Sequence, residues 1–185
     1  CSGEYFTLKP DAEMAVDQRG DDAGSLVFET EVLNEARDYL GMPRLKLTVK
    51  SDAPFANLCA RIVDVHPDGS SLRVAFGVLN LAHRMSSEHP EPLTPGQATE
   101  IEMDLDAMGY RFAPGHRIRM SLSTSYWPLM LPPPQDATLT VDTGSIELSL
   151  PKLGAAERIE MKEPDNPDPL PTYLEQLPAA TRRSV

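Results

Sequence analysis

The chain has 185 residues, of which 41% are hydrophobic, so it is long and apolar enough to bury one substantial core. Its 17 Lys and Arg residues against 28 Asp and Glu residues give a formal net charge of −11. That charge argues against nucleic acid and anionic membranes as partners, because both are bound by concentrated positive charge.

The sequence begins with Cys1 rather than methionine, which predicts a fragment, a processed product or a trimmed chain. A processed bacterial lipoprotein also begins with cysteine followed by small residues such as Ser2 and Gly3. No apolar run approaches the roughly 18 residues needed to span a bilayer, and no signal-type segment opens the sequence. We therefore expect no membrane partner and a soluble, cytoplasmic protein.

Residues 1–24 are rich in charge and turn formers, and they predict an extended lead-in. They contain Arg19-Gly20-Asp21, an integrin-type tripeptide, but a three-residue match is common by chance. The tripeptide therefore carries no functional prediction.

Eight runs after this lead-in alternate between apolar and polar residues or are otherwise β-rich, which is typical of strands. All 18 prolines lie outside these runs, as expected where strands donate backbone hydrogen bonds. The predicted strands are 25–33, 44–51, 57–66, 71–82, 97–105, 117–127, 137–142 and 145–150.

The connections indicate how these strands pair. Pro67-Asp68-Gly69-Ser70 and Asp142-Thr143-Gly144 have turn chemistry and predict two hairpins. The stretch 88–96 is too rich in proline for regular structure and predicts a crossover between sheets. Short strands, hairpins, crossovers and no helical period together predict an all-β fold, a two-sheet β-sandwich of jelly-roll type. An immunoglobulin-like sandwich is the alternative, but its Cys…Trp…Cys spacing is absent.

Beyond residue 150 the chain becomes polar and rich in proline. We expect a sandwich domain over 25–150 and an acidic, Pro-rich C-terminal tail over 151–185. Residues 172–177 could add one helical turn that docks on the sandwich.

The sequence offers no strong nucleophile. An α/β-type serine hydrolase needs a G-x-S-x-G elbow, which is absent. Ser70 and Ser71 follow Gly69 in a predicted turn, and turn preference alone explains serine there. Cys59 lies within a predicted strand and is interpreted as a buried free thiol, so no disulfide framework is expected.

Four histidines lie in predicted loops or turns. His83, Glu88 and His89 could form a metal site, but their spacing matches no strong ligand pattern, so hydrogen-bonding or solvated histidines are favoured. His66 and His116 lie in turns.

Two acidic pairs, Asp21-Asp22 and Asp64/Asp68, could bind calcium. Both lack the dense alternation of oxygen ligands seen in an EF-hand loop. We expect no metal and no cofactor.

Tyr126 and Trp127 are the strongest ligand-facing candidates, because an exposed aromatic loop on a jelly roll can stack on a sugar or cover a partner's pocket. The competing interpretation is that Trp127 caps the sandwich core. The residues alone thus indicate a β-sandwich accessory or binding domain.

Five motifs follow one another along the chain: DQRGDDAGSLVFET (17–30), ARIVDVHPDGSSLRV (60–74), GVLNLAHR (77–84), PGHRIRMSLS (114–123) and SYWP (125–128). In this order they resemble the C-terminal domain of the cocaine esterase and X-Pro dipeptidyl-peptidase family of serine hydrolases. The resemblance covers roughly residues 16–150 and implies a galactose-binding-like jelly roll. The first fifteen residues and the tail after Pro151 match nothing in that pattern.

The resemblance implies a three-part parent enzyme with an α/β-hydrolase domain, a helical cap and this jelly roll. The Ser-Asp-His triad would belong to the α/β-hydrolase domain, so no residue here inherits a catalytic role. The implied parent chemistry is acyl transfer on X-Pro peptides, aryl esters, or β-lactam side-chain amides or esters.

Two hypotheses follow. The first is a non-catalytic accessory domain that scaffolds the catalytic domain and edges its active site with the loops around His83 and His89 and around 126–134. The second is an independent carbohydrate-binding module that uses Tyr126 and Trp127. A third, that the chain is itself an enzyme, is disfavoured by the missing nucleophile motif.

Overall fold

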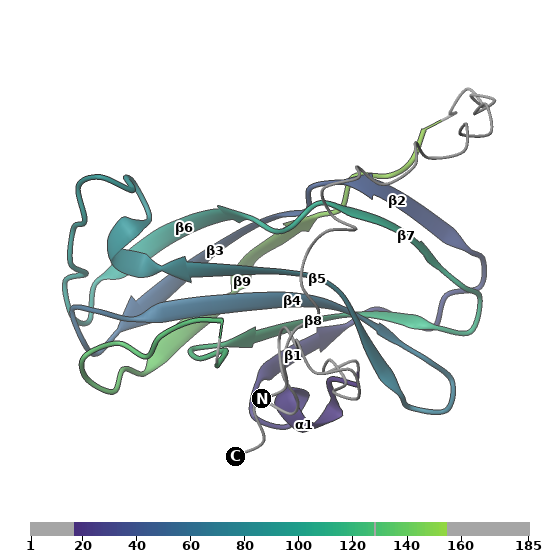
Figure 1. Ribbon diagram of the computed structural model, residues 1–185, viewed down its shortest axis with the longest axis horizontal. Coiled ribbons are helices and arrows are strands. Elements are labelled where there is room, and N and C mark those ends of the chain that lie inside the picture. Colours follow the sequence, from purple (N-terminus) through teal and green to yellow (C-terminus); the bar gives the residue numbers. More distant parts are fainter. Residues whose placement is uncertain (1–16, 128, 155–185) are drawn as a thin grey trace, which may run out of the picture. The chain divides into compact units, whose positions relative to one another are not determined.

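In the computed structural model, which describes residues 17–127 and 129–154, the alternating runs form antiparallel strands in two facing layers (Figure 1). The first layer is one sheet with the strand order β1 (Leu26–Glu29), β8 (Arg117–Ser123), β4 (Asn57–Val65) and β5 (Ser71–Asn80). The second layer has the order β6 (Ala98–Asp104), β3 (Arg44–Ser51) and β9 (Leu139–Ser149), with β2 (Arg37–Gly41) paired to β7 (Met108–Phe112). The described helical elements are two short turns, α1 (Arg19–Asp22) and the 3-10 turn η1 (Leu81–His83). No helix among the described residues is long and apolar enough to cross a membrane.

The β2–β7 pair continues the β3–β6 ladder. Gly41 lies opposite Met108 and Arg44 lies opposite Asp104, so the two ladders follow one another with a short interruption. The interruption falls at Pro43, which lacks a backbone N–H to donate. Neither β2 nor β7 was among the predicted strands, because each is a five-residue piece without a clear alternation of its own.

The core lies between the two layers. Alternate residues of each strand point inward, as the sequence predicted. The buried apolar side chains that fill it include Leu45, Leu47, Val49, Leu58, Ala60, Ile62, Ile101, Met103, Phe112, Ile118, Met120 and Leu122.

The crossovers confirm the predicted sandwich. The Pro-rich stretch after η1 carries the chain from β5 in the first sheet to β6 in the second. The hairpin at 67–70 joins β4 to β5, and Gly69 supplies the positive φ (+85°) that its turn requires. The fold is an all-β sandwich.

The second predicted hairpin, at Asp142-Thr143-Gly144, is wrong. Residues 139–149 form one strand that pairs with β3 on both sides of residues 143–146, where the register shifts between Lys46 and Thr48. The Asp142 side chain accepts a hydrogen bond from Gly144 N at 3.0 Å, and Thr48 N donates to Ser145 Oγ at 2.7 Å. The turn chemistry therefore produces a bulge in a continuous strand instead of a reversal.

Two further boundaries differ from expectation. The predicted extended lead-in contains the helical turn α1, whose Asp22 is buried against the first sheet. The strand predicted over 117–127 ends at Ser123, because the chain then turns over the sheet toward Tyr126.

The chain divides into two compact units, Cys1–Gly154 and Ala155–Val185. The first four residues after 150 still belong to the sandwich unit. Leu40 N donates to Pro151 O and Leu153 N donates to Asp38 O, both at 2.9 Å. The remainder of the predicted tail, including the suggested helical turn at 172–177, lies outside the described residues.

Candidate functional site

Three long connections meet at one end of the sandwich and are joined by hydrogen bonds (Figure 1). Leu93 N donates to Pro54 O at 2.8 Å and Leu81 N donates to Ala56 O at 2.9 Å. Asn57 Nδ2 of β4 donates to Leu131 O at 2.8 Å, and Thr138 N donates to Asp52 Oδ1 at 2.7 Å, which joins the third connection to the first. We call the segments 52–56, 84–97 and 129–138, together with Trp127, the loop end.

The loop end displays large apolar side chains. Trp127 is 59% exposed, Met85 77%, Leu131 74% and Phe55 36%. Exposed apolar residues are normal on a surface, and the described chain exposes others as strongly, Leu40 at 60% and Met42 at 57%. Met85 lines a hollow with Lys46 and Glu100 of the second sheet. What distinguishes the loop end is that its apolar side chains lie on connections that are hydrogen-bonded to one another.

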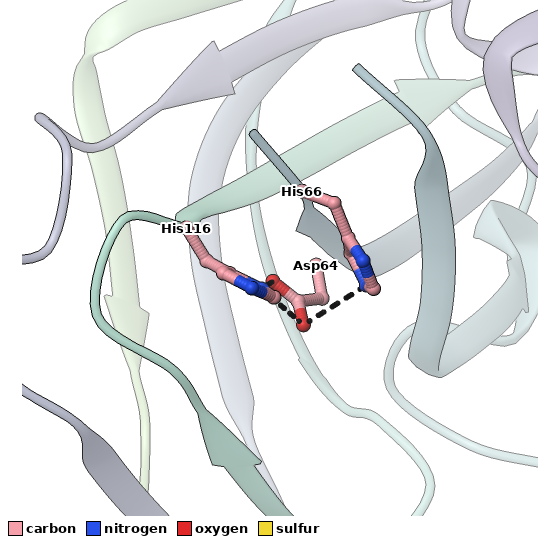
Figure 2. Close-up of side chains that lie close together, drawn as sticks. All are labelled: Asp64, His66 and His116. Carbon is pink, nitrogen blue, oxygen red and sulfur yellow. Dashed lines mark hydrogen bonds and ion pairs between the residues drawn. The ribbon is translucent and has the colours of Figure 1, made fainter. Parts of the chain in front are cut away.

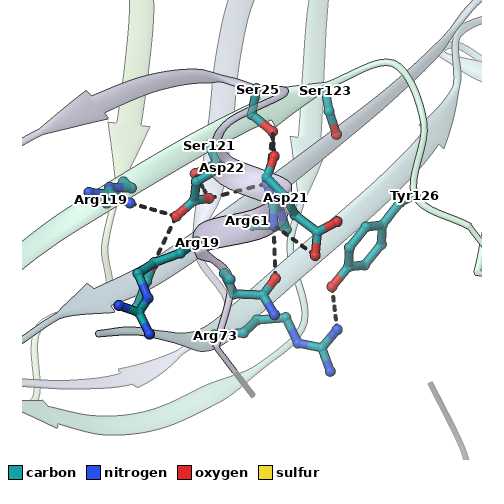
Figure 3. Close-up of polar contacts among 12 residues, drawn as sticks. Arg19, Asp21, Asp22, Ser25, Arg61, Arg73, Arg119, Ser121, Ser123 and Tyr126 are labelled. Atoms are coloured by element: carbon teal, nitrogen blue, oxygen red, sulfur yellow. Dashed lines mark hydrogen bonds and ion pairs between the residues drawn. The ribbon is translucent and has the colours of Figure 1, made fainter. Parts of the chain in front are cut away.

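Tyr126 is not part of that surface, although it was predicted to face a ligand together with Trp127. Its side chain is only 4% exposed, and its hydroxyl accepts a hydrogen bond from Arg73 Nη1 (Figure 3). The guanidinium of Arg61 lies 5.6 Å from its ring centroid, and Phe76 packs against it at 5.6 Å. Burial raises the pKa of the phenol. The structure therefore separates the two aromatic residues: Trp127 is exposed, whereas Tyr126 lines a small polar hollow with Asp21, Ser25 and Arg61.

His83 and His89 lie in the connection that follows β5. His83 is half-buried, with Nδ1 3.2 Å from Ser86 O, whereas His89 is exposed and has Nε2 3.9 Å from Glu88 Oε2. The two histidines are not brought together with a third ligand. Within the described part of the chain, the cluster of metal-ligand side chains is a different one, discussed below.

The outer face of the first sheet carries a buried polar network that sequence analysis missed. Arg61 of β4 is 1% exposed, and its guanidinium donates to Gln18 Oε1 and Ser25 Oγ, each at 2.8 Å, and lies 3.2 Å from Asp22 Oδ1 (Figure 3). Asp22 also accepts hydrogen bonds from Ser71, Ser121 and Arg119 at 2.6–2.8 Å. The segment 17–25 is thereby fixed onto the sheet.

In the first candidate calcium pair, both oxygens of Asp22 are engaged by cations and hydroxyls of this network. The second pair is also divided. Asp68 accepts hydrogen bonds from Ser70 N and Ser70 Oγ, which lower its pKa, while Asp64 faces two imidazoles.

The described serines and histidines form no nucleophile–base pair. Ser70 Oγ donates to Asp68 within the turn, and Ser71 Oγ donates to Asp22 within the network. Arg19 of the integrin-type tripeptide is paired with Asp17 at 2.6 Å. The described Ser70 and Ser71 thus serve the turn and the polar network of a β-sandwich.

Comparison with known proteins gives the family. The sequence model of the X-Pro dipeptidyl-peptidase C-terminal non-catalytic domain matches residues 3–167. The chain therefore belongs to this family of non-catalytic domains. The match extends beyond residues 16–150 on both sides, so the expectation that both ends fall outside the family pattern is wrong.

Relatives agree with that assignment. A cocaine esterase from Rhodococcus is 32% identical over 103 residues, which cover 56% of this chain and 18% of that protein. A protein from Rhodopirellula baltica described as a putative Xaa-Pro dipeptidyl-peptidase is 30% identical over 144 residues, which cover 75% of this chain and 23% of that protein. The matches thus span about a fifth of either relative.

Solved structures share the fold. An α-amino acid ester hydrolase superposes with a TM-score of 0.69 and 26% identity, over 75% of this chain and 27% of that one. An aminopeptidase from a Thaumarchaeota archaeon gives a TM-score of 0.70 at 24% identity, over 81% of this chain and 30% of that one.

Proposed function

We propose that this chain is the C-terminal accessory domain of a larger serine hydrolase, and that its loop end docks against the α/β-hydrolase domain of the same polypeptide. The observation that carries the proposal is that three connections with exposed apolar side chains are hydrogen-bonded to one another at one end of the sandwich. Apolar side chains held on fixed loops lose exposed area when a neighbouring domain packs on them, which favours docking there.

The relatives indicate which domain docks on the loop end. They match this chain over about a fifth of their length and are described as esterases or peptidases, so the rest of each relative supplies the chemistry. The parent reaction is accordingly acyl transfer from an ester or an X-Pro amide. The chain's own contribution is to bind the catalytic domain and hold it in place.

The finer part of the proposal concerns the active-site entrance. The segment that carries His89 and the segment that carries Trp127 extend furthest from the paired strands at this end (Figure 1). Docked on a catalytic domain, they edge the entrance and contact substrate groups outside the scissile bond. The helical cap implied by the family resemblance is a second neighbour for the same loops.

Paired double variants of the full-length parent test the docking. Trp127→Ser with Leu131→Ser removes two exposed apolar side chains from the loop end, and we expect a loss of about 2–5 kcal/mol in the parent's stability because docked side chains lose their burial. The matched control is Leu40→Ser with Met42→Ser, at the end of β2 and just after it, where the side chains are 60% and 57% exposed. In the isolated chain both pairs should change stability by less than about 0.5 kcal/mol. Equal effects of the two pairs in the parent would contradict docking through the loop end.

The entrance role has a separate readout. We expect His89→Ala in the parent to change KM for an extended substrate while leaving turnover of a small p-nitrophenyl ester unchanged. An unchanged KM for every substrate would restrict the loop end to docking.

The carbohydrate-binding alternative retains one exposed aromatic residue, Trp127, since Tyr126 is buried. Trp127 is also the single tryptophan of the chain, so its fluorescence reports directly on sugar stacking. Emission that does not respond to a broad glycan panel would remove this alternative.

A further inference from the structure

A cluster of ligand-type side chains lies at the end of β4 opposite to the loop end. Asp64 is on β4, His66 is in the turn that follows, and His116 directly precedes β8 (Figure 2). Val65 pairs with Arg117, so the two antiparallel neighbours bring these residues together although they are 50 residues apart in sequence.

The backbone holds the two histidines in place. His66 N donates to Ser70 O at 2.9 Å, and His66 O accepts from Gly69 N at 2.9 Å. The carbonyl of His116 accepts from Leu33 N at 2.8 Å. The cluster is therefore built on fixed turns of the sandwich.

The distances suit a small metal ion. His116 Nδ1 lies 2.9 Å from Asp64 Oδ1, His66 Nε2 lies 3.5 Å from Asp64 Oδ2, and one ligand atom from each residue lies within 4.8 Å of the others. Ligands of a tetrahedral zinc ion at about 2.0–2.2 Å are about 3.3–3.6 Å apart. A movement of about 0.4 Å would bring the His116 contact to that spacing.

One candidate ligand atom, His66 Nε2, makes no hydrogen bond. His66 Nε2 is buried and has no hydrogen-bond partner, although the rim of its imidazole is solvent-accessible. Buried polar atoms in folded proteins are nearly always paired, so this nitrogen is typical of a position that a ligand completes. The Asp64 carboxylate, whose side chain is 2% exposed, is the group that it faces.

We propose that Asp64, His66 and His116 bind one divalent transition-metal ion, with Zn²⁺ as the preferred ion. Two imidazole nitrogens and one carboxylate select Zn²⁺ or Co²⁺ over Ca²⁺ and Mg²⁺, which take oxygen ligands. Three protein ligands leave the fourth position to water. The hydroxyl of Tyr110 on β7 donates to Asp64 Oδ2 at 2.8 Å and orients the carboxylate from outside the ligand set.

The bound ion fixes three parts of the sandwich to one another. It joins the β4–β5 hairpin to the turn between β7 and β8, and Tyr110 connects β7 to the same carboxylate. The site is separate from the loop end, so its existence does not depend on the docking proposed above.

Titration of the chain with Co²⁺ and then Zn²⁺ at neutral pH tests the site. Cys1→Ser serves as the background in every sample, so that a terminal thiol cannot bind metal. We expect one Co²⁺ per chain with visible d–d absorption, displaced by one Zn²⁺, and a raised Tm with either ion.

Variants locate the ion. His66→Gln should weaken Zn²⁺ binding at least ~10-fold, and Tyr110→Phe should weaken it about 10- to 100-fold without removing a ligand. The matched control, His83→Gln with His89→Gln, should bind as the background does. His66 is partly exposed, so His66→Gln is expected to fold even if His116→Gln does not.

Three results would overturn the proposal. They are no stoichiometric uptake up to about 100-fold excess of either metal, Zn²⁺ affinity unchanged in folded His66→Gln, and binding lost in the His83/His89 control. Any of these results would mean that the three side chains form a hydrogen-bonded cluster without a metal ion.

Discussion

The two faces of β4 are both buried, yet they are buried by different means. The inner face places Leu58, Ala60 and Ile62 in the apolar core between the sheets. The outer face places Arg61 against the segment 17–25 and beside Tyr126. On the inner face, neighbouring side chains need only fit one another in shape and volume. On the outer face, the buried Arg61 cation needs specific hydrogen-bond acceptors and carboxylates around it.

The difference shows how the N-terminal segment is fixed. Asp22 contacts Ser71, Ser121 and Arg119, which come from β5 and β8. A single helical turn of four residues has little stability of its own, so these long-range contacts hold it. The polar face therefore decides where the start of the described chain lies.

The largest effect is expected at Arg61. Arg61→Ala leaves the acidic partners from segment 17–25 buried without their central cation, and we expect a loss of about 3–5 kcal/mol in the free energy of unfolding. The neighbouring Ile62→Val truncates the apolar face by one methylene and should cost about 0.5–1.5 kcal/mol. Urea unfolding of both variants measures the contrast. If Arg61→Ala cost no more than Ile62→Val, the polar face would not be a structural element.

A smaller effect is expected at the loop that covers this face. Tyr126→Phe removes the hydroxyl that accepts from Arg73 while keeping the ring over Arg61, so we expect a loss of about 0.5–1.5 kcal/mol. Trp127→Phe is the matched control, and it should change stability in the isolated chain by less than about 0.5 kcal/mol. The reverse order of the two effects would mean that Trp127, not Tyr126, caps the sandwich.

Alternation identified the inner face from the sequence because its signal is local. The β4–β5 hairpin and the Pro-rich crossover were likewise predicted, since turn residues act on their immediate neighbours. The outer face was missed because Gln18, Ser25 and Arg61 meet only in the folded chain, 36 to 43 residues apart. The hairpin predicted at 142–144 was wrong because pairing with β3 overrides the local turn preference of these residues.

The candidate site residues also differ in how far the sequence could predict their positions. The sequence left Trp127 open between a ligand-facing position and a cap on the core, and in the structure its side chain is 59% exposed. The burial of Tyr126 depends on Arg73 and Phe76 of β5. The sequence placed His66 and His116 in turns without linking them, because only the β4–β8 register brings them to Asp64.

The last expected change concerns a buried thiol and appears only at high pH. Burial raises the pKa of the Cys59 thiol to about 11, so at pH 8 this thiol should not react with a thiol reagent in the folded chain. Above the unfolded pKa of about 9 the unfolded chain ionises first, so Cys59 should lower stability as the pH rises from 9 to 11. Thiol titration of Cys1→Ser with and without urea, and unfolding at pH 8 and 10 beside Cys59→Ala, measure both effects. Rapid labelling of the folded chain would show that the outer face opens.

Hydrogen exchange of the isolated chain and of the same residues within the full-length parent tests the central claim most directly. The account predicts slower exchange in the parent at the loop end, segments 52–56, 84–97 and 129–138, with little change at β2 and β7. Unchanged exchange at the loop end, or protection confined to β2 and β7, would contradict docking through these loops.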